Sequence, residues 1–159
     1  MSEDSADFFL KVDGIQGEGG DPGHRDELRI LSFSKAASSP HERGGGMALS
    51  PPVCDDIRFT MRVDRAYPGL LQTSMNNLVL KTVVLTCRKA GKEAQQYLKI
   101  TLSDVMISSC RLTASPDSNP IPMVHFSLNF AQIQEEYRAQ KGLGTLGGSI
   151  MYSYTLKKA

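Results

Sequence analysis

The chain has 159 residues, with 18 lysines and arginines against 17 aspartates and glutamates, so its formal net charge at pH 7 is +1. This balance argues against a nucleic-acid-binding protein, which normally carries a basic excess. An apolar content of 40% and a charged content of 22% are near globular averages, which excludes wholesale disorder and favours a single domain over residues 1–159.

Two strands separated by a loop are predicted in the first part of the chain. Apolar residues at every second position predict a strand over 8–12. Residues 14–23 combine glycine with aspartate and proline, a composition typical of a loop. Apolar residues at adjacent positions predict a second strand over 27–34, buried on both faces.

Residues 35–52 form the most unusual segment of the sequence. They are rich in glycine, serine and proline and show no periodicity. Long segments of this kind inside a compact domain are usually functional or disordered. We expect a flexible loop rather than a domain boundary, because the sequence before it has too few strands for a core of its own.

A strand followed by a short helix is predicted next. Apolar residues alternate with polar ones over 55–64, which predicts a strand with one buried face. Asp64 is a suitable N-cap for the following residues, and Pro68 fits the first turn of a helix. The sequence therefore predicts a helix over about residues 67–76.

Three long strands are predicted over 78–89, 95–112 and 123–137, and a last one over 150–156. The third of them alternates most clearly, with a buried and a wet face. Its apolar residues, which we assign to the core, are Val124, Phe126, Leu128 and Phe130. The polar residues of its other face include His125, Ser127 and Asn129.

The apolar pattern changes face within two of these strands. Leu102 and Val105 fall in phases of opposite parity, as do Phe130 and Ile133. Such a change indicates bulges or sharp bends, which curl a sheet into a barrel. We predict a mainly β fold, an antiparallel β-barrel of about seven to eight strands with one short flanking helix and a long extended loop.

Neither a disulfide scaffold nor a membrane span is indicated. The three cysteines are odd in number and lack metal-binding spacing. The acidic N-terminus has no apolar core like that of a signal peptide, and nothing approaches the ~18 apolar residues of a membrane span. We expect folding in the reducing cytoplasm, no membrane insertion and no export by the signal-peptide route.

The strongest catalytic alternative is a metal site formed by His24, Asp26 and His125. Two histidines and one carboxylate are the ligands of non-haem iron sites on jelly-roll barrels. However, His125 is predicted on the wet face of its strand, and no motif for a carboxylate co-substrate follows it. The glycines of residues 14–23 match no phosphate-binding spacing. We therefore expect two surface histidines and no cofactor.

Several of these segments, taken in order, match the pattern of a known family. The most specific are Val105-Met-Ile-Ser-Ser109 and Leu128-Asn-Phe-Ala-Gln-Ile-Gln-Glu-Glu-Tyr137. Phe9-Leu-Lys-Val-Asp-Gly14 and Glu27-Leu-Arg-Ile-Leu-Ser32 also match. With them, nearly the whole chain outside the long loop and the two ends resembles the haemolysin-coregulated protein (Hcp) family, which forms the inner tube of the bacterial type VI secretion system.

The resemblance implies a structural protein without catalytic activity. Members of the family form a barrel flanked by one helix and assemble head-to-tail into a hexameric ring. Rings stack into a hollow tube, which carries a spike protein at its tip and which a contractile sheath drives out of a Gram-negative bacterium. Effector proteins ride in the lumen. The alternatives are a secreted effector or adaptor that docks on such a tube, and the metal-dependent enzyme described above.

Two features of the sequence fit this resemblance. The polar face with His125, Ser127 and Asn129 suits a water-filled lumen, although exterior solvent explains it equally well. The loop over 35–52 suits an arm that orders on a neighbouring subunit, with a mobile surface loop as the alternative. The residues predicted to form that subunit contact are Arg43, Gly44, Gly45, Gly46, Met47 and Leu49.

Overall fold

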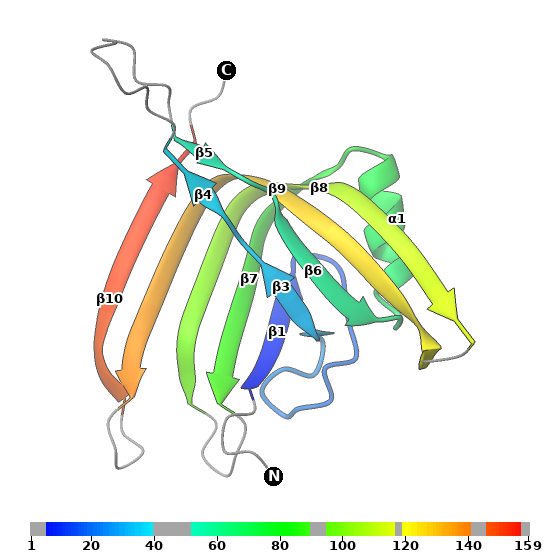
Figure 1. The fold of residues 1–159 in the computed structure, drawn as a ribbon, viewed down its shortest axis with the longest axis horizontal. Coiled ribbons are helices and arrows are strands. Elements are labelled where there is room, and N and C mark those ends of the chain that lie inside the picture. The colour runs from blue at the N-terminus through cyan, green and yellow to red at the C-terminus, as the bar shows by residue number, and fades with distance from the viewer. Residues whose placement is uncertain (1–5, 40–51, 90–94, 117–118, 141–145, 157–159) are drawn as a thin grey trace.

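The computed structural model describes residues 6–39, 52–89, 95–116, 119–140 and 146–156 (Figure 1). In chain order, its elements are β1 (Ala6–Val12), β2 (Leu28–Ile30), β3 (Ser32–Ser34), β4 (Ala37–Ser38), β5 (Val53–Cys54), β6 (Ile57–Arg62), α1 (Tyr67–Met75), β7 (Val79–Lys89), β8 (Gln96–Ser115), β9 (Asn119–Gln140) and β10 (Leu146–Thr155). Within these described segments, no helix has the length and apolar character needed to cross a membrane.

Seven strands form a nearly closed antiparallel barrel in the order β2-β1-β7-β8-β9-β6-β3. β2 and β3 belong to one stretch of chain, in which β2 pairs with β1 and β3 pairs with β6. Between them, the backbone N–H of Leu31 donates to the carbonyl of Thr60 at 2.8 Å. This stretch bridges the two ends of the sheet. The prediction of a mainly β barrel with one short helix is therefore confirmed.

The bridging stretch corrects the prediction of one strand over 27–34 that is buried on both faces. The structure divides it at Leu31, whose side chain is 42% exposed. Leu28 and Ile30 are buried, whereas exposed serines flank Phe33 in the next strand. The chain changes its pairing partner from β1 to β6 at this point. Closing the barrel therefore turns Leu31 outward.

β9 is long enough to have different partners along its length. Its first half pairs with β6 and its second half with β10, while β8 pairs along almost all of it. β10, red in Figure 1, lies outside the closed circuit at one side of the sheet, and α1 lies at the opposite side. Among the described residues, no strand pairs with the outer edge of β10.

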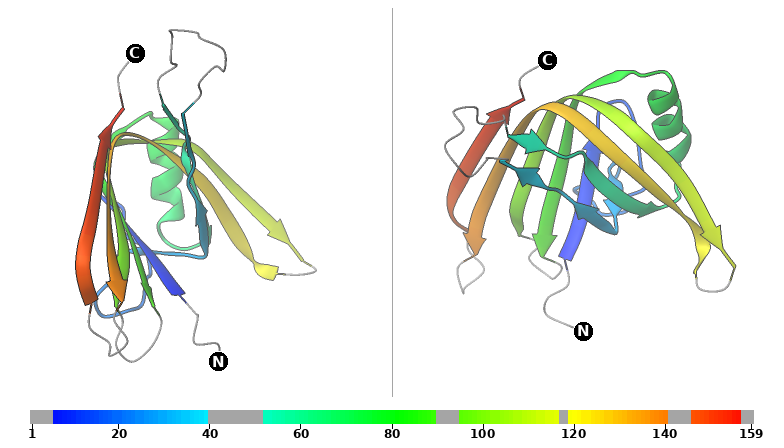
Figure 2. Two further views of the ribbon diagram at one scale, coloured as in Figure 1. Left: turned by 60° about the vertical axis from the view of Figure 1, so that its left-hand side comes forward. Right: turned by 45° about the horizontal axis from the view of Figure 1, so that its top comes forward.

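The predicted change of face occurs at one line across the sheet. Leu102 and Val105 are both buried, and so are Phe130 and Ile133, which pair with them across strands. Between the first two, Asp104 has a positive φ of 52°, a conformation that breaks the regular alternation of the strand. β7 makes the same change at the positions facing β8. The long strands consequently bend around the barrel (Figure 2).

The core contains the residues that the alternation assigned to it. Phe126, Leu128 and Phe130 are at most 3% exposed. The ring of Phe126 stacks on that of Phe59 in the facing position of β6, with centroids 5.1 Å apart. Aromatic pairs of this kind add stability beyond the area that they bury. β6 and β9 are thus held by side-chain packing as well as by their backbone ladder.

Helix α1 begins at the predicted residue and ends one residue earlier than predicted. Its N-cap is Ala66 rather than the predicted Asp64. Oδ1 of Asp64 instead accepts a hydrogen bond from the N–H of Ala66 at 2.8 Å, which fixes the turn before the helix. Leu70 is fully buried, and Oγ of Ser74 donates to the carbonyl of Ile107 at 3.2 Å. The helix is therefore anchored on β8.

The described ends of the predicted 35–52 loop are ordered. β4 and β5 pair antiparallel as a two-stranded ribbon, with Ala37 opposite Cys54. The N–H of Asp55 also donates to the carbonyl of Ala36 at 2.9 Å. The ribbon extends the path of β3 and β6 away from the barrel. The middle of the predicted loop, residues 40–51, lies outside the described residues, and its flexibility stays a prediction.

Candidate functional site

A polar groove of about 600 Å³ lies on the outward face of β3, β6, β9 and β8. Its polar side chains come from alternate positions of these strands, whose other positions fill the core. Strand pairing arranges them in two cross-strand rows. The first row consists of Ser32, Thr60, His125 and Arg111, and the second row consists of Ser34, Arg58, Ser127 and Ser109.

His125 sits in the middle of the polar groove between two threonines. Its Nδ1 is 3.2 Å from Oγ1 of Thr60, and its Nε2 is 3.1 Å from Oγ1 of Thr113. Each ring nitrogen therefore has one hydroxyl partner, so that one hydroxyl accepts and the other donates when the imidazole is neutral. This arrangement fixes the ring against the sheet, in keeping with a half-buried side chain on the wet face.

Ser127 departs from the prediction of a wet position, because it is only 8% exposed. The cause is a bulge in β8, where the register with β9 shifts between Ile107 and Ser109. The bulge brings two hydroxyls onto the one opposite it: Oγ of Ser108 lies 2.6 Å and Oγ of Ser109 2.5 Å from Oγ of Ser127. The hydroxyl of Ser127 therefore forms its hydrogen bonds with neighbouring side chains rather than with water.

Asn129 is exposed, as expected for the wet face. Its Nδ2 donates to Oδ1 of Asp56 at 3.0 Å. The other carboxylate oxygen of Asp56 accepts from Oγ of Ser108 at 2.6 Å. This carboxylate, at the beginning of β6, is consequently engaged by neutral donors on both of its oxygens.

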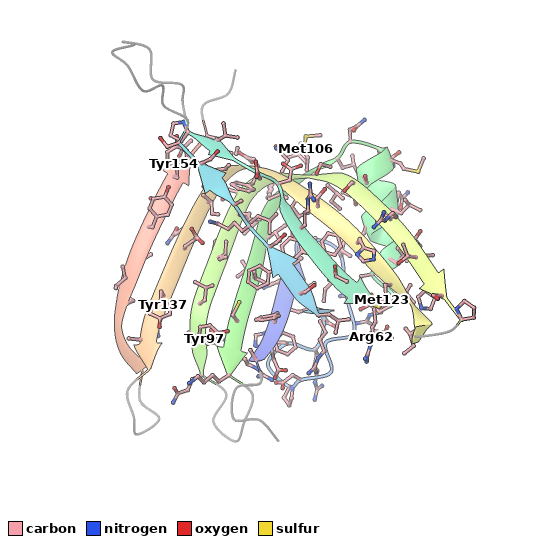
Figure 3. All side chains as sticks on the ribbon, viewed as in Figure 1. Arg62, Tyr97, Met106, Met123, Tyr137 and Tyr154 are labelled. Carbon is pink, nitrogen blue, oxygen red and sulfur yellow. The ribbon has the colours of Figure 1, made fainter. Side chains whose placement is uncertain are left out.

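Three arginines on the same face have no such partners. Arg58 and Arg111 line the polar groove, and Arg62 follows Thr60 on the outward side of β6. Figure 3 shows Arg62 beside Met123 near the end of that strand. Within the described part of the chain, none of these guanidinium groups has a hydrogen-bond or ion-pair partner. The sequence pattern predicts which residues of β6 point outward. It does not predict that Arg111 of β8 lies on the same face, because the bulge at Ser108 changes the alternation.

The predicted subunit-contact residues Arg43, Gly44, Gly45, Gly46, Met47 and Leu49 lie outside the described residues. Their role stays a prediction.

His24 is not a surface residue, contrary to the prediction. It is 8% exposed and stacks on Phe9, with ring centroids 4.4 Å apart and an interplanar angle of 6°. Its Nδ1 lies 2.7 Å from Oε2 of Glu27. The loop that follows β1 folds back over the sheet, and this stacking holds it there. The turn-rich composition of the loop gave no sign of the packing.

The residues proposed for a metal site have separate structural roles. His24 binds Glu27, Asp26 accepts from the guanidinium of Arg65 at 2.8 Å, and His125 is held by threonines. Among the described residues, no three histidine, cysteine or carboxylate side chains are grouped as a metal site would require. The three ligands that sequence spacing suggested are therefore not brought together.

Arg88 is the electrostatic anchor of the same loop. Its guanidinium lies 4.8 Å from the centroid of the Phe9 ring and donates to the carboxylates of Asp7 and Asp21. The hydrogen bond from Arg88 holds the pKa of Asp21 below its ordinary value. The same bond raises the pKa of Arg88. The cluster couples β1, β7 and the loop.

The face of the sheet that lines the barrel core continues onto β10, where it is exposed to solvent. Ile150 pairs with Tyr137, which pairs in turn with the half-buried Leu98. Tyr137 is 47%, Ile150 71% and Tyr152 53% exposed. Figure 3 shows this side of the sheet, with Tyr137 on β9 and Tyr154 on β10. We call Tyr137, Ile150 and Tyr152 the open flap. The final alternation predicted its strand but not its exposure.

Comparison with known proteins identifies the family of the chain. The family model described as "Type VI secretion system effector, Hcp" matches residues 9–137. The chain is 34% identical to Protein hcp1 of Pseudomonas aeruginosa over 158 residues, which cover 97% of each protein. The barrel and these matches define a structural, non-enzymatic component of type VI secretion.

Solved structures agree in fold and family. The crystal structure of Hcp1 from Salmonella typhimurium is 28% identical, covers 95% of this chain and 94% of its own, and superposes with a TM-score of 0.78. A type VI secretion system effector from Yersinia pestis is 26% identical, covers 94% of this chain and 100% of its own, and has the same TM-score of 0.78. The chain belongs to the Hcp family of secreted type VI secretion tube proteins.

Proposed function

We propose that the protein is the protomer of a hexameric ring and that such rings stack into the hollow inner tube of a type VI secretion system. The tube assembles in the cytoplasm inside a contractile sheath, carries a spike protein at its tip and leaves the cell with effector proteins in its lumen. Residues 1–159 act as one tube domain in this proposal. The single observation that carries it is the open flap.

The open flap is an unfavourable surface for an isolated protein. Fully burying a large apolar side chain such as Ile150 contributes about 1.5–3 kcal/mol relative to leaving it exposed. Its strand, β10, has an outer edge without a partner among the described strands, and such an edge invites pairing with another chain. A neighbouring copy of the protein would cover both the side chains and the edge.

A second apolar patch lies on a different part of the surface, where α1 runs into β7. Its side chains are Met75, Leu78, Val79 and Met106, with exposures of 74%, 51%, 58% and 36%. α1 and β10 stand at opposite sides of the molecule in Figure 1. Two unlike patches on opposite sides favour a head-to-tail contact, and a head-to-tail contact that closes produces a ring.

The polar groove supports the lumen of the proposed tube. Its hydroxyls and arginines lie on the sheet face turned away from the barrel core. A wall facing water inside a ring needs such a face, whereas a face that packs against another subunit is normally depleted of charge at its centre. We therefore place the polar groove toward the lumen and the open flap in the subunit contact.

The test is the mass of the purified protein in solution, measured by light scattering, together with electron micrographs of negatively stained particles. We expect six protomers per particle and ring-shaped views. Ile150→Asp should dissociate the ring, because it places a charge in an apolar contact. Ser153→Asp is the matched control, since it adds the same charge to the same strand on the opposite face.

A strictly monomeric wild-type protein at micromolar concentrations would refute the ring. Equal dissociation by Ile150→Asp and Ser153→Asp would refute the role of the open flap but leave the ring in place. Far-ultraviolet circular dichroism of each variant checks that the protomer remains folded.

A further inference from the structure

The polar groove concentrates positive charge that nothing in the described chain neutralises. Arg58 lies in the row of Ser127, and Arg111 lies in the adjacent row of His125, so their guanidinium groups come from different strands toward one groove. Arg62 adds a third positive charge on the same side of β6. Two surface arginines elsewhere in the molecule, Arg29 and Arg65, form ion pairs with Asp7 and Asp26.

The carboxylate nearest to these arginines in sequence does not serve as their counter-ion. Asp56 lies just before β6, two residues ahead of Arg58, but accepts from Ser108 and Asn129 instead. No ion pair within 4.0 Å joins these two residues in the described structure. The arginines remain free to donate to a ligand, and the serine hydroxyls of the rows beside them add neutral donors.

We propose that the polar groove binds the carboxylate groups of an acidic protein segment, and so selects cargo with an acidic surface. This inference rests on the proposed function, which turns the groove toward the lumen. The planar guanidinium fork matches a carboxylate with two parallel hydrogen bonds. In a ring the arginines of every protomer would face one channel, which strengthens the field along it.

The groove is poorly suited to nucleic acid, the other common acidic ligand. Single-stranded nucleic acid is normally held by bases that stack on exposed aromatic rings. Three phenylalanine rings line this region: Phe59 and Phe126 are each 2% exposed and belong to the core beneath, and the partly buried Phe33 packs edge-on against Phe8, with ring centroids 5.2 Å apart. The net charge of +1 also gives no general basic surface for phosphate backbones.

The experiment measures the binding of a fluorescent glutamate-rich decapeptide to the full-length protein by fluorescence anisotropy at low salt. Arg58→Gln combined with Arg111→Gln should weaken binding about tenfold or more, because two charge-assisted pairs are lost. Lysine at both positions should restore only part of the affinity, since lysine keeps the charge but not the fork. High salt should weaken wild-type binding.

Arg25→Gln is the matched control, because Arg25 is an exposed arginine without a described partner that lies in the loop after β1 rather than in the groove. Equal peptide affinity of the double variant and the wild type would overturn the inference. An equal loss of peptide affinity in the Arg25→Gln variant would also overturn the inference, since it would show nonspecific electrostatic attraction. Stronger competition by an oligothymidylate decamer than by unlabelled peptide would replace the acidic segment with nucleic acid.

The mass of each sample separates this inference from the proposed function. Six-protomer particles that fail to bind the peptide would refute the acidic cargo and keep the ring. A monomeric protein that binds the peptide through Arg58 and Arg111 would refute the ring and keep the carboxylate-binding groove.

Discussion

The two halves of β9 use one alternating pattern for two different purposes. In the first half, β6 and β8 enclose the strand, and Phe126 stacks on Phe59 inside the barrel. In the second half, β10 replaces β6, and the inward position of Tyr137 is 47% exposed. The sequence pattern is similar in both halves. In the second half, Ile133 is still buried, and the exposed part of the face begins beyond it, at Tyr137.

This difference shows that alternation reports which face of a strand is apolar, not what covers it. Within the barrel, the bridging stretch at Leu31 brings β6 over the sheet and completes the core. Beyond β6, the described elements cover this face in part: Lys35 forms an ion pair with Glu135 at 3.3 Å, whereas Tyr137 and Ile150 are 47% and 71% exposed. We infer that a neighbouring protomer covers the exposed side chains there. The comparison therefore distinguishes residues that stabilise the fold of one chain from residues that stabilise the assembly.

The sharpest way to break this comparison is to truncate one side chain in each half. Phe126→Ala should lower the free energy of unfolding by about 3–5 kcal/mol, because it leaves a cavity in the core. Tyr137→Ala should lower it by about 1 kcal/mol or less, as is usual for an exposed side chain. Urea unfolding followed by circular dichroism measures both.

Both substitutions are best introduced into the Ile150→Asp variant, in which unfolding is not linked to subunit dissociation. In the otherwise native sequence, Tyr137→Ala should instead weaken the ring. Similar losses of protomer stability from the two substitutions would show that the open flap belongs to the core of the single chain.

The fold was accessible from the sequence because local patterns determine most of it. Alternation located the long strands, and the change of parity at Leu102 and Val105 located their bend. The split at Leu31 and the bulge at Ser108 were not accessible, since both depend on which strands meet in space. The buried position of Ser127 follows from that bulge and was missed for the same reason.

A second prediction, with a smaller expected loss of stability, concerns the loop after β1 on the closed side of the barrel. Arg88→Gln should lower the free energy of unfolding by about 1–3 kcal/mol, because it removes charge-assisted hydrogen bonds and the contact with the Phe9 ring. Arg29→Gln is the matched control: it shares Asp7 as partner, but its side chain is 56% exposed, and exposed pairs contribute about 1 kcal/mol or less.

The Arg88 cluster also predicts how stability depends on pH. The hydrogen bond from Arg88 lowers the pKa of Asp21 below its ordinary value of 3.8. The contribution of this carboxylate is therefore present above that value and is lost as the pH falls through the lower, folded-state pKa. The difference in stability between wild type and Arg88→Gln should narrow below about pH 4. A difference that stays constant from pH 7 to pH 3 would contradict the assignment.

The candidate site was less accessible than the fold. Alternation placed His125 and Asn129 on the outward face, but it gave no reason to single out Arg58 and Arg111. Their importance depends on the absence of described counter-ions, and counter-ions are a property of the folded chain. The pairing of His24 and Asp26 by sequence spacing was misleading, because loop packing separates their contacts.

The smallest expected effect concerns the chemical reactivity of two cysteines rather than the stability of the protein. Cys87 lies on the closed side of the barrel, is 1% exposed and has its pKa raised by burial to about 12, so about one thiol in ten thousand is ionised at pH 8. Cys54 is partly exposed in the ribbon outside the barrel. Iodoacetamide at pH 8 should therefore modify Cys54 in the folded protein and reach Cys87 only in urea, as peptide mass spectrometry will show. Equal labelling of the two cysteines without urea would mean that β7 is as accessible as the ribbon. The contrast between the enclosed barrel and the elements outside it would then fail.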